Sequence, residues 1–567
     1  MRRIKESFVE RDARNRAKAV LDRGTFREIV GPFDRVESPH LVMQGIVPQS
    51  DDGVIVARGK IAGEPAVVIS IEGKFQGGGI GEVSGSKIAG ALEFALRDNE
   101  KGIRTRAVLL LDTGGVRLQE ANYGLLCIAE IQAAIVALRR YVPVVGVIPG
   151  KIGSFGGMSI TAGLCSALIM TREGRIGLNG PEVIEQEAGI EEFDASDREL
   201  IWNTIGGAQR HAAGFVDELV EDDVDAIRKA IHAACEKGCH DKPRSSHVDL
   251  YGSLLREIDP AQPMTPVRFR EMWNKVKGGN SYTHKRREGT KPSPKDGELA
   301  SRGRVWFNLL TGRSQPLAGE VPSVLCADAR IGEERVRYIA VVPNPVSRFP
   351  RARQGEVGLE EGWTLAKYVR EAVEADQDGD RRAIVAIVDV PSQAYGYLEE
   401  LMGIHQACAA AVDAYATARL AGHPVIALLV GHAISGAFLS HGLQANRILA
   451  IDDHAVHVHV MSKQSAARIT RRHLEELEEA AKKVPAIAYD IRSFSTLGAL
   501  HALIEGVNAD APGEEDRAVI QAKLCEAIIS ARSASRDLSS RLSSDEAQKG
   551  GRAASILVRK RLAEQWM

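Results

Sequence analysis

The stretch of sequence best suited to catalysis contains neither an obvious nucleophile nor a metal cluster. It contains glycines, which leave the backbone N–H groups accessible. IGSFGGMSITAG, residues 152–163, follows a buried apolar run and leads into a helix of small residues. The first N–H groups of a helix lack internal acceptors, and the helix dipole favours negative charge there. Glycine has no Cβ to keep an oxygen away from these groups. We therefore predict that Gly156 and Gly157 donate hydrogen bonds to an oxygen that becomes negative during a reaction.

A second glycine loop follows the neighbouring apolar strand. It reads DTGGVR, residues 112–117, and offers the N–H groups of Gly114 and Gly115 to the same edge of a sheet. Two amides that converge from separate loops make an oxyanion hole, and losing one donor costs about 2.7–4 kcal/mol of transition-state stabilisation. A tight turn with close helix packing is the simpler interpretation of either loop alone.

The same pattern returns in the second half of the chain. AIVAIVDVPS, PVIALLVG and AISGAFLSHG repeat RAVLLLDTGG, PVVGVIPG and GSFGGMSITAG in the same order, with Asp389 matching Asp112. This shared order of strand, loop, helix, strand, glycine turn and helix indicates a duplicated domain. Ser435, Gly436 and Ala437 take the place of the first glycine turn, so the sequence predicts a pair of oxyanion holes.

The elements that must position these loops are strands alternating with helices, which predicts the α/β class with partly parallel sheets. VIVARGKIAGEPAVVISI alternates around Ala62-Gly63-Glu64 and predicts a hairpin. Helices are expected over residues 4–21, 86–99, 125–141 and 398–420. The polar, Pro- and Gly-rich residues 285–303 read as a linker, and ELASRGRVWFNLLTG reads as a short amphipathic helix that docks onto a domain.

Composition excludes several classes of function. The net charge of −2 over 567 residues gives no overall case for nucleic acid or anionic membrane. The charged N-terminus lacks the apolar core of a signal peptide, and no apolar run nears the roughly 20 residues of a membrane span. Cys235, Cys239 and His240 do not have a standard zinc spacing, so no metal is expected. We expect a cytoplasmic protein that binds neither nucleic acid nor membrane.

Weaker signals leave alternatives open. Gly77, Gly78, Gly79 and Gly81 could form a backbone nest for a phosphate or a thioester arm, or only a packing loop. Arg117 could contact substrate, or form a charge pair that holds its own loop.

Four histidines are also ambiguous. His432 and His441 flank the second glycine turn and are candidate proton donors, and His457 and His459 share one face of a predicted strand. Ordinary packing is the simpler interpretation of all four.

The motifs FQGGGIGEVSGSK, DTGGVRLQE, GSFGGMSITAG and RIGLNGPEVIE, in this order, resemble the carboxyltransferase branch of the crotonase superfamily. Within that branch the sequence is similar to malonate decarboxylase. Residues up to about 315 resemble its beta subunit, and residues from about 320 resemble its gamma subunit, as a fusion. The resemblance implies two crotonase-like domains, ββα spirals of the ClpP/crotonase type related by internal duplication. Their expected ranges are 1–245 and 320–567, with a linker and docking helix over 246–319.

The resemblance also implies an activity and partners. The reaction would be decarboxylation of malonyl-S-acyl carrier protein to acetyl-S-acyl carrier protein and CO2, through an enolate held at the meeting point of the halves. The second-half turn, Gly436 and Ala437, would hold the enolate oxygen. No cofactor would be attached to this chain, because the thioester is carried on the phosphoribosyl-dephospho-CoA group of a separate acyl carrier protein. An acetyl-S-ACP:malonate ACP transferase would load malonate, and a higher oligomer is compatible with this scheme.

The main alternative is the carboxyltransferase component of a biotin-dependent acyl-CoA carboxylase or decarboxylase. Bacterial acetyl-CoA carboxyltransferases carry a CxxC…CxxC zinc ribbon before this domain, whereas no cysteine precedes Cys127 here. None of the nine methionines precedes a lysine, so no biotinylation motif is present, although another chain could deliver biotin. A non-catalytic scaffold that docks a carrier protein is the alternative from another class.

Overall fold

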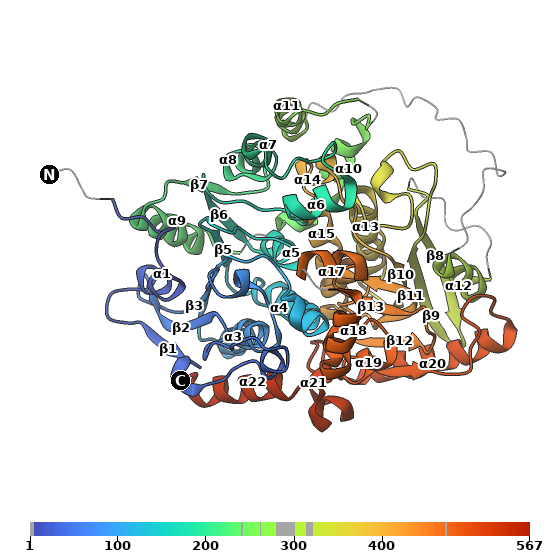
Figure 1. The fold of residues 1–567 in the computed structure, drawn as a ribbon. Helices are drawn as coiled ribbons and strands as arrows, with labels where there is room; N and C mark the ends of the chain where they lie inside the picture. Colours follow the sequence, from blue (N-terminus) through green and yellow to red (C-terminus); the bar gives the residue numbers. More distant parts are fainter. Residues whose placement is uncertain (1–4, 240–241, 261, 279–300, 313–320, 471–472) are drawn as a thin grey trace.

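The computed structural model describes residues 5–567 except 240–241, 261, 279–300, 313–320 and 471–472, and it contains two α/β domains side by side (Figure 1). The first sheet has the order β1-β2-β3-β4-β5-β6-β7, in which the two pairs at the β1 edge are antiparallel and all others are parallel. Its strands are β1 (Arg27–Ile29), β2 (Val54–Ile61), β3 (Glu64–Ile71), β4 (Arg106–Leu110), β5 (Val144–Ile148), β6 (Ala167–Thr171) and β7 (Glu218–Val220).

The second sheet has the order β14-β12-β11-β10-β9-β8, and β13 pairs with the far end of β11. Only the pair β8–β9 is antiparallel. Its strands are β8 (Val324–Ile331), β9 (Glu334–Val341), β10 (Ala383–Val390), β11 (Val425–Ile434), β12 (Arg447–Ile451), β13 (His457–His459) and β14 (Ala502–Ile504).

Helices cover both sheets and fill the space between them (Figure 1). Those before the second sheet are α1 (Ala13–Val20), α2 (Pro39–Val42), α3 (Glu82–Glu100), α4 (Ala121–Leu138), α5 (Gly157–Leu164), α6 (Pro181–Ala188), α7 (Arg198–Ile205), α8 (Gly207–Ala212), α9 (Val224–Glu236), α10 (Val248–Arg256), α11 (Pro266–Lys277) and α12 (Arg302–Thr311). Those after it are α13 (Leu359–Ala375), α14 (Tyr397–Leu401), α15 (Ile404–Leu420), α16 (Ser435–Ser440), α17 (Lys463–Thr470), α18 (Leu474–Lys483), α19 (Ile491–Ser495), α20 (Glu514–Ser533), α21 (Ser540–Ser543) and α22 (Ala553–Gln565).

The predicted duplication is confirmed in detail. The order β2-β3-α3-β4-α4-β5-α5-β6 returns as β8-β9-α13-β10-α15-β11-α16-β12, interrupted only by the short α14. The two hairpins bury the same positions, because four buried residues open β2 and β8 and six close β3 and β9. The predicted α/β class and the internal duplication of one domain are therefore confirmed.

The glycine turns lie where the two domains meet. Helices α4 and α5 of the first domain pack against α15 and α16 of the second. A Cβ on Gly157 would lie 2.7 Å from Leu439 Cδ1, and one on Gly163 would lie 2.9 Å from Ala409 Cβ. Small residues on α5 thus allow the close approach of the domains. The apolar stretch 118–138 is long enough to span a membrane, but it is fully buried at this interface, as a core helix is.

Two helices differ from the sequence prediction. The first helix begins at Ala13 rather than near residue 4, because Asp222 binds the N–H groups of Phe8 and Val9 in a non-helical segment. The helix expected over 398–420 breaks at Gly403, whose φ of +77° ends α14 and starts α15.

The predicted docking helix is α12, which buries Trp306 and Phe307 and donates Trp306 Nε1–H to the Ala509 carbonyl at 3.0 Å. The proposed linker range 246–319 also holds α10 and α11, which bury Tyr251 and Phe269. Most of the linker stretch 285–303 lies outside the described residues. The domain boundaries remain a prediction.

The C-terminal helix α22 returns to the first domain and packs along α3 (Figure 1). Glu130, buried in α4, contacts Arg552 at 2.8 Å and Arg559 at 2.9 Å. Burial alone would raise the pKa of Glu130, but the charges of Arg552 and Arg559 lower it to about 2. This buried cluster fixes the last helix of the second half on the first half.

We expect Glu130→Gln to lower the free energy of unfolding by about 3–5 kcal/mol, because it leaves the buried Arg552 without its carboxylate. Glu564→Gln on α22 is the matched control. It removes an exposed pair with Arg561 and should cost no more than about 0.5 kcal/mol. Thermal unfolding of the full-length chain measures both, and equal melting temperatures for the two variants would contradict this role of Glu130.

Candidate functional site

The aspartate at the end of β4 sets the relative position of the two first-half loops. The Asp112 carboxylate accepts the N–H groups of Ile152 at 2.9 Å and Gly153 at 3.3 Å, and it pairs with buried Arg16 at 2.8 Å. Beyond it, a parallel bridge joins Thr113 to Ser154. The DTGGVR loop and the glycine turn therefore leave the sheet side by side.

Gly115 and Gly156 are the residues that let these loops touch. Their φ values are +103° and +57°. A Cβ on Gly115 would lie 3.0 Å from the Phe155 carbonyl oxygen and 3.2 Å from Gly156 Cα. A side chain at either position would separate the loops, so the glycines shape the site through space as well as through φ.

Three of the four predicted first-half donors already have acceptors. The N–H of Gly114 binds the Gly77 carbonyl at 2.9 Å, that of Gly115 binds Thr113 Oγ1 at 3.0 Å, and that of Gly156 binds the Leu178 carbonyl at 3.0 Å. The prediction that these three donate to a ligand is therefore wrong. The N–H of Gly157 has no acceptor among the described residues, although Gly157 is buried. A buried N–H without a partner is costly, so this donor is free for a ligand oxygen.

A donor that the sequence analysis did not single out completes the pair. Ile80 donates its N–H to Gly115 O at 2.8 Å, and its carbonyl accepts the N–H of Arg117 at 2.9 Å. Val116 lies between Gly115 and Arg117, the two residues that bond Ile80. In such a parallel bridge the N–H of Val116 therefore points away from Ile80. Val116 N lies 4.0 Å from the position of a Cβ on Gly156 and has no acceptor in the described structure. Val116 and Gly157 are therefore the candidate donor pair of the first half.

Strand register identifies the counterparts in the second half. Val390 pairs with Ala433 as Thr113 does with Ser154, and Val357 pairs with Gln393 as Ile80 does with Val116. Counting from these pairs, Gln393 corresponds to Val116, Ser435 to Gly156 and Gly436 to Gly157. The φ of Ser435, +58°, matches that of Gly156, which is unusual for a residue with a side chain.

The second donor pair is therefore Gln393 and Gly436, and here the Gly436 N–H is already bound. It donates to Oε1 of Gln393 at 3.1 Å. The other two predicted residues, Ser435 and Ala437, flank Gly436 in the first turn of α16. Of the predicted second-half set, the register supports Gly436 as the equivalent donor and adds Gln393, which the sequence analysis missed.

A buried carboxylate connects the two turns. Glu400 accepts the N–H of Leu178 at 3.1 Å and that of Asn179 at 2.6 Å. The carbonyl of Leu178 receives Gly156 N–H, while the side chain of Asn179 contacts Gln393 at 2.8 Å. Burial raises the pKa of Glu400 to about 7, and Arg210, 3.5 Å away, partly offsets this.

The glycine loop that precedes α3 is a packing loop. A Cβ on Gly78 would lie 2.2 Å from the Asp112 carbonyl oxygen, and one on Gly81 would lie 2.0 Å from the Glu120 carboxylate. The N–H groups of Gly78, Gly79 and Gly81 bind Phe75, Gln76 and Ser84. No nest remains for a phosphate, so the binding role predicted for these three residues is not supported; Gly77 is exposed and accepts Gly114 N–H.

Arg117 holds its own loop. Its buried guanidinium contacts Asp52 at 2.6 Å and Glu120 at 2.7 Å. The carboxylates of Asp52 and Glu120 also accept the N–H groups of Ser84 and Glu82 in the first turn of α3. The structure thus supports the charge-pair interpretation of Arg117 and not the contact with substrate.

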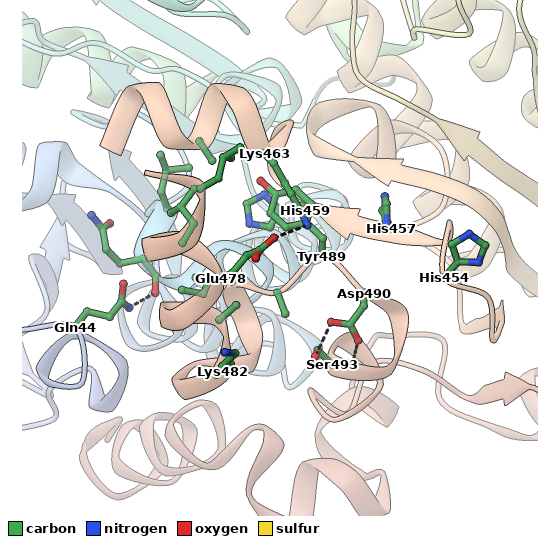
Figure 2. Close-up of a pocket in the computed structure, with 18 residues that line it drawn as sticks. Gln44, His454, His457, His459, Lys463, Glu478, Lys482, Tyr489, Asp490 and Ser493 are labelled. Atoms are coloured by element: carbon green, nitrogen blue, oxygen red, sulfur yellow. Dashed lines mark hydrogen bonds and ion pairs between the residues drawn. The ribbon is translucent and has the colours of Figure 1, made fainter. Parts of the chain in front are cut away.

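A pocket of about 420 Å³ lies between the η3 turn (Leu118–Glu120) of the first half and β13, α17 and α18 of the second. We call it the seam pocket (Figure 2). Leu118 lies two residues beyond Val116, and His459 pairs with Ile434, the residue before Ser435. Its lining combines apolar side chains, such as Leu477 and Ile487, with the basic Lys463, Lys482 and His454 and the acidic Glu478 and Asp490.

Two of the four candidate histidines are unsuited to supply a proton. Burial lowers the pKa of His441 to about 4 and that of His459 to about 3, so both are neutral near pH 7. His441 contacts the Tyr415 hydroxyl and the Ile387 carbonyl, and His459 stacks on Tyr489 with ring centroids 3.8 Å apart. His457 lines the seam pocket, and the ring of His432 packs edge-on against the ring of His457. A role of these two histidines in supplying a proton stays a prediction. No group of residues suited to hold a metal occurs among the described residues.

The raised pKa of Glu400 predicts a pH-dependent stability. Between about pH 4.5 and pH 7 the folded protein keeps a proton on Glu400 that the unfolded chain releases. The wild type should therefore lose up to about 3 kcal/mol relative to Glu400→Gln, which does not titrate, as pH rises through this range. Unfolding of both proteins at a series of pH values measures the difference. A difference that is constant from pH 4.5 to 7 would contradict the assignment.

Comparison with known proteins agrees with this architecture. Residues 352–566 match the family model of the malonate decarboxylase gamma subunit. Two Malonomonas rubra proteins named malonyl-S-ACP:biotin-protein carboxyltransferase are similar to parts of the chain. MADC is 43% identical over 41% of this chain and 76% of its own length, and MADD is 39% identical over 33% and 66%.

The chain is also similar in sequence to a solved structure. A chain of a Pseudomonas malonate decarboxylase hetero-tetramer in complex with malonate is 57% identical, with 47% of this chain and 97% of that chain covered and a TM-score of 0.47. The identity to the curated MADC relative and the gamma-subunit match together decide the family. This chain belongs to the malonate decarboxylase family and carries the beta-type and gamma-type subunits in one polypeptide.

Proposed function

We propose that this chain converts malonyl-S-acyl carrier protein to acetyl-S-acyl carrier protein and CO2, with the thioester oxygen held by the N–H groups of Val116 and Gly157. The observation that carries the proposal is the buried N–H of Gly157, which has no acceptor in the described structure and follows Gly156, whose Cβ position would lie 4.0 Å from Val116 N. The family relationship supports the choice of a malonyl substrate.

The chemistry needs little more than such a donor pair. When the bond between C2 and the carboxylate breaks, CO2 leaves and the electron pair forms an enolate whose negative charge lies on the thioester oxygen. Two backbone donors fixed beforehand stabilise that charge without reorganisation. A proton then adds to C2 and gives the acetyl thioester. No nucleophile is required, which fits a site composed of glycine turns.

The first-half pair replaces the second-half assignment that the family resemblance implied. There Gly436 N–H is bound to Gln393 Oε1, whereas Val116 and Gly157 have no competing acceptor in the described residues. In the second half a thioester oxygen would have to displace the carboxamide of Gln393 from the Gly436 N–H. In the first half it would have no hydrogen-bonded side chain to displace.

The seam pocket fits the carrier arm. A CoA-derived group presents phosphates and a pantetheine chain with two amide groups, and the pocket offers Lys463, Lys482 and His454 beside apolar and polar side chains. We propose that the phosphoribosyl-dephospho-CoA group of a separate acyl carrier protein reaches the Val116–Gly157 pair through this pocket. That carrier protein and an acetyl-S-ACP:malonate ACP transferase would be the partners, within a multi-subunit assembly like the Pseudomonas hetero-tetramer. The cytoplasm is the compartment we expect.

Transfer of the carboxyl group to biotin is the second candidate, because both Malonomonas relatives are named as biotin-protein carboxyltransferases. The products differ: decarboxylation releases CO2, and transfer leaves the carboxyl group on biotin.

Gly157 offers a matched pair of variants, because it is the first residue of α5, where proline is tolerated. Gly157→Pro removes the N–H, while Gly157→Ala keeps it and introduces the same Cβ close to Leu439. We expect kcat for CO2 release from malonyl-CoA to fall about 10²–10³-fold further in Gly157→Pro than in Gly157→Ala. Equal kcat values in two folded variants would exclude Gly157 N–H as the donor.

The same assay separates the two candidate reactions. Decarboxylation by the purified chain should proceed without added biotin and should be unaffected by avidin. Loss of CO2 release in the presence of avidin would favour the biotin-dependent reaction.

Lys482 and Lys483 test the route of the carrier arm. They are neighbours at the end of α18, and only Lys482 lines the seam pocket. Lys482→Ala should raise KM for malonyl-CoA about 3–10-fold with kcat unchanged, as expected when an exposed charge contact with phosphate is lost. Lys483→Ala should leave both constants unchanged. Equal effects of the two substitutions on KM would argue against this pocket as the binding route.

A further inference from the structure

The two donor pairs have the same backbone and differ in one side chain. At the position of Val116 the second half has Gln393, whose own N–H belongs to the pair and has no acceptor in the described part of the chain. The side chain of Val116 has no polar atom that could accept the N–H of Gly157. Gln393 has such an atom, Oε1, which accepts Gly436 N–H at 3.1 Å. Only 5% of Gln393 is exposed, so this contact with the second-half donor is buried.

The orientation of this carboxamide is fixed by its neighbours. The Ala394 carbonyl can only accept, so Asn179 turns Nδ2–H toward it, at 3.0 Å. The Asn179 Oδ1 atom must then face Gln393, whose Nε2–H donates to it at 2.8 Å. The remaining atom, Gln393 Oε1, therefore faces Gly436 N–H, and this order of donors and acceptors makes the reverse amide orientation unfavourable.

We propose that Gln393 is a specificity-determining residue: its carboxamide oxygen closes the second oxyanion hole and so restricts this chain to a reaction with one developing oxyanion. The inference rests on the proposed function. Decarboxylation develops charge on a single oxygen, that of the thioester. Transfer to biotin develops charge on a second, because the ureido nitrogen of biotin must lose its proton before it attacks the carboxyl carbon, and this places charge on the ureido oxygen.

The transfer reaction that Gln393 prevents is balanced as follows. The bond between malonyl C2 and its carboxyl carbon breaks, a bond between biotin N1′ and that carbon forms, and the proton from N1′ ends on C2. Malonyl thioester and biotin thus become acetyl thioester and carboxybiotin. Because the Gly436 N–H is bound to Gln393 Oε1, it is not available to the ureido oxygen.

Two substitutions separate an open hole from a blocked one. Gln393→Ala removes the carboxamide and leaves room, whereas Gln393→Leu fills similar space with apolar atoms. Both remove the donor to Asn179 Oδ1 equally, so a structural effect of that loss appears in both. The full-length chain is incubated with malonyl-CoA labelled in its free carboxyl group and with free biotin, and label in CO2 and in carboxybiotin is counted.

We expect Gln393→Ala to form carboxybiotin at least about tenfold faster than the wild type and Gln393→Leu. Transfer by the wild type at the rate of Gln393→Ala, or no gain in a folded Gln393→Ala, would overturn the proposal. CO2 release without biotin in all three proteins reports the decarboxylase function separately. Equilibrium dialysis with labelled biotin gives a second readout that needs no turnover: Gln393→Ala should bind about tenfold more tightly than Gln393→Leu, and equal binding would also overturn the proposal.

Discussion

The geometry of both glycine turns depends on one buried carboxylate. Glu400, at the end of the short α14 in the second half, accepts the N–H groups of Leu178 and Asn179 from the first half. Leu178 in turn receives Gly156 N–H, and Asn179 contacts the carboxamide of Gln393. The Gly156 N–H is bound in this way, whereas the Gly157 N–H that follows it has no acceptor in the described residues. The break in the helix at Gly403 is what separates α14, which bears Glu400, from α15.

Duplication explains why such a site exists twice, and a single side chain explains why the copies differ. Strand register makes Val116 equivalent to Gln393 and Gly157 equivalent to Gly436 in the two domains. Backbone donors are set by register and φ, so both copies keep them. Their availability differs, because the Gly157 N–H has no acceptor in the described residues whereas the Gly436 N–H is bound to Gln393 Oε1. Fusion into one chain keeps the two copies in a fixed ratio, and α22 on α3 adds a second connection far from the turns.

The sequence was sufficient for the elements and for the general place of the site. Buried apolar runs, the Ala62-Gly63 hairpin and the repeated Asp112 and Asp389 are local patterns, and the structure confirms each. Which N–H groups are free could not be predicted, because the acceptors of Gly114 and Gly156 come from Gly77 and Leu178, which are distant in sequence.

Val116 and Gln393 were missed for a related physical reason. Each is marked as a donor only by its bridge partner, Ile80 or Val357, and by the direction in which that bridge turns its N–H. The break at Gly403 did leave a signal, since Leu401-Met402-Gly403 places a glycine inside an otherwise helical pattern. The sequence leaves Arg117 open between substrate contact and a charge pair, and the structure shows the charge pair. Its partner Asp52 could not be predicted, because Asp52 lies in a segment that no local pattern connects to Arg117.

The central claim is that two backbone N–H groups of the first half bind the thioester oxygen. Infrared difference spectroscopy of acetyl-CoA labelled with ¹³C at the thioester carbonyl, bound to the full-length chain, observes that oxygen directly. Two strong donors polarise the carbonyl, so its stretching frequency should fall below that of the free thioester in water, and the shift should be absent in Gly157→Pro but retained in Gly157→Ala. A carbonyl frequency in the bound state that equals or exceeds that in water, with binding verified, would contradict the account.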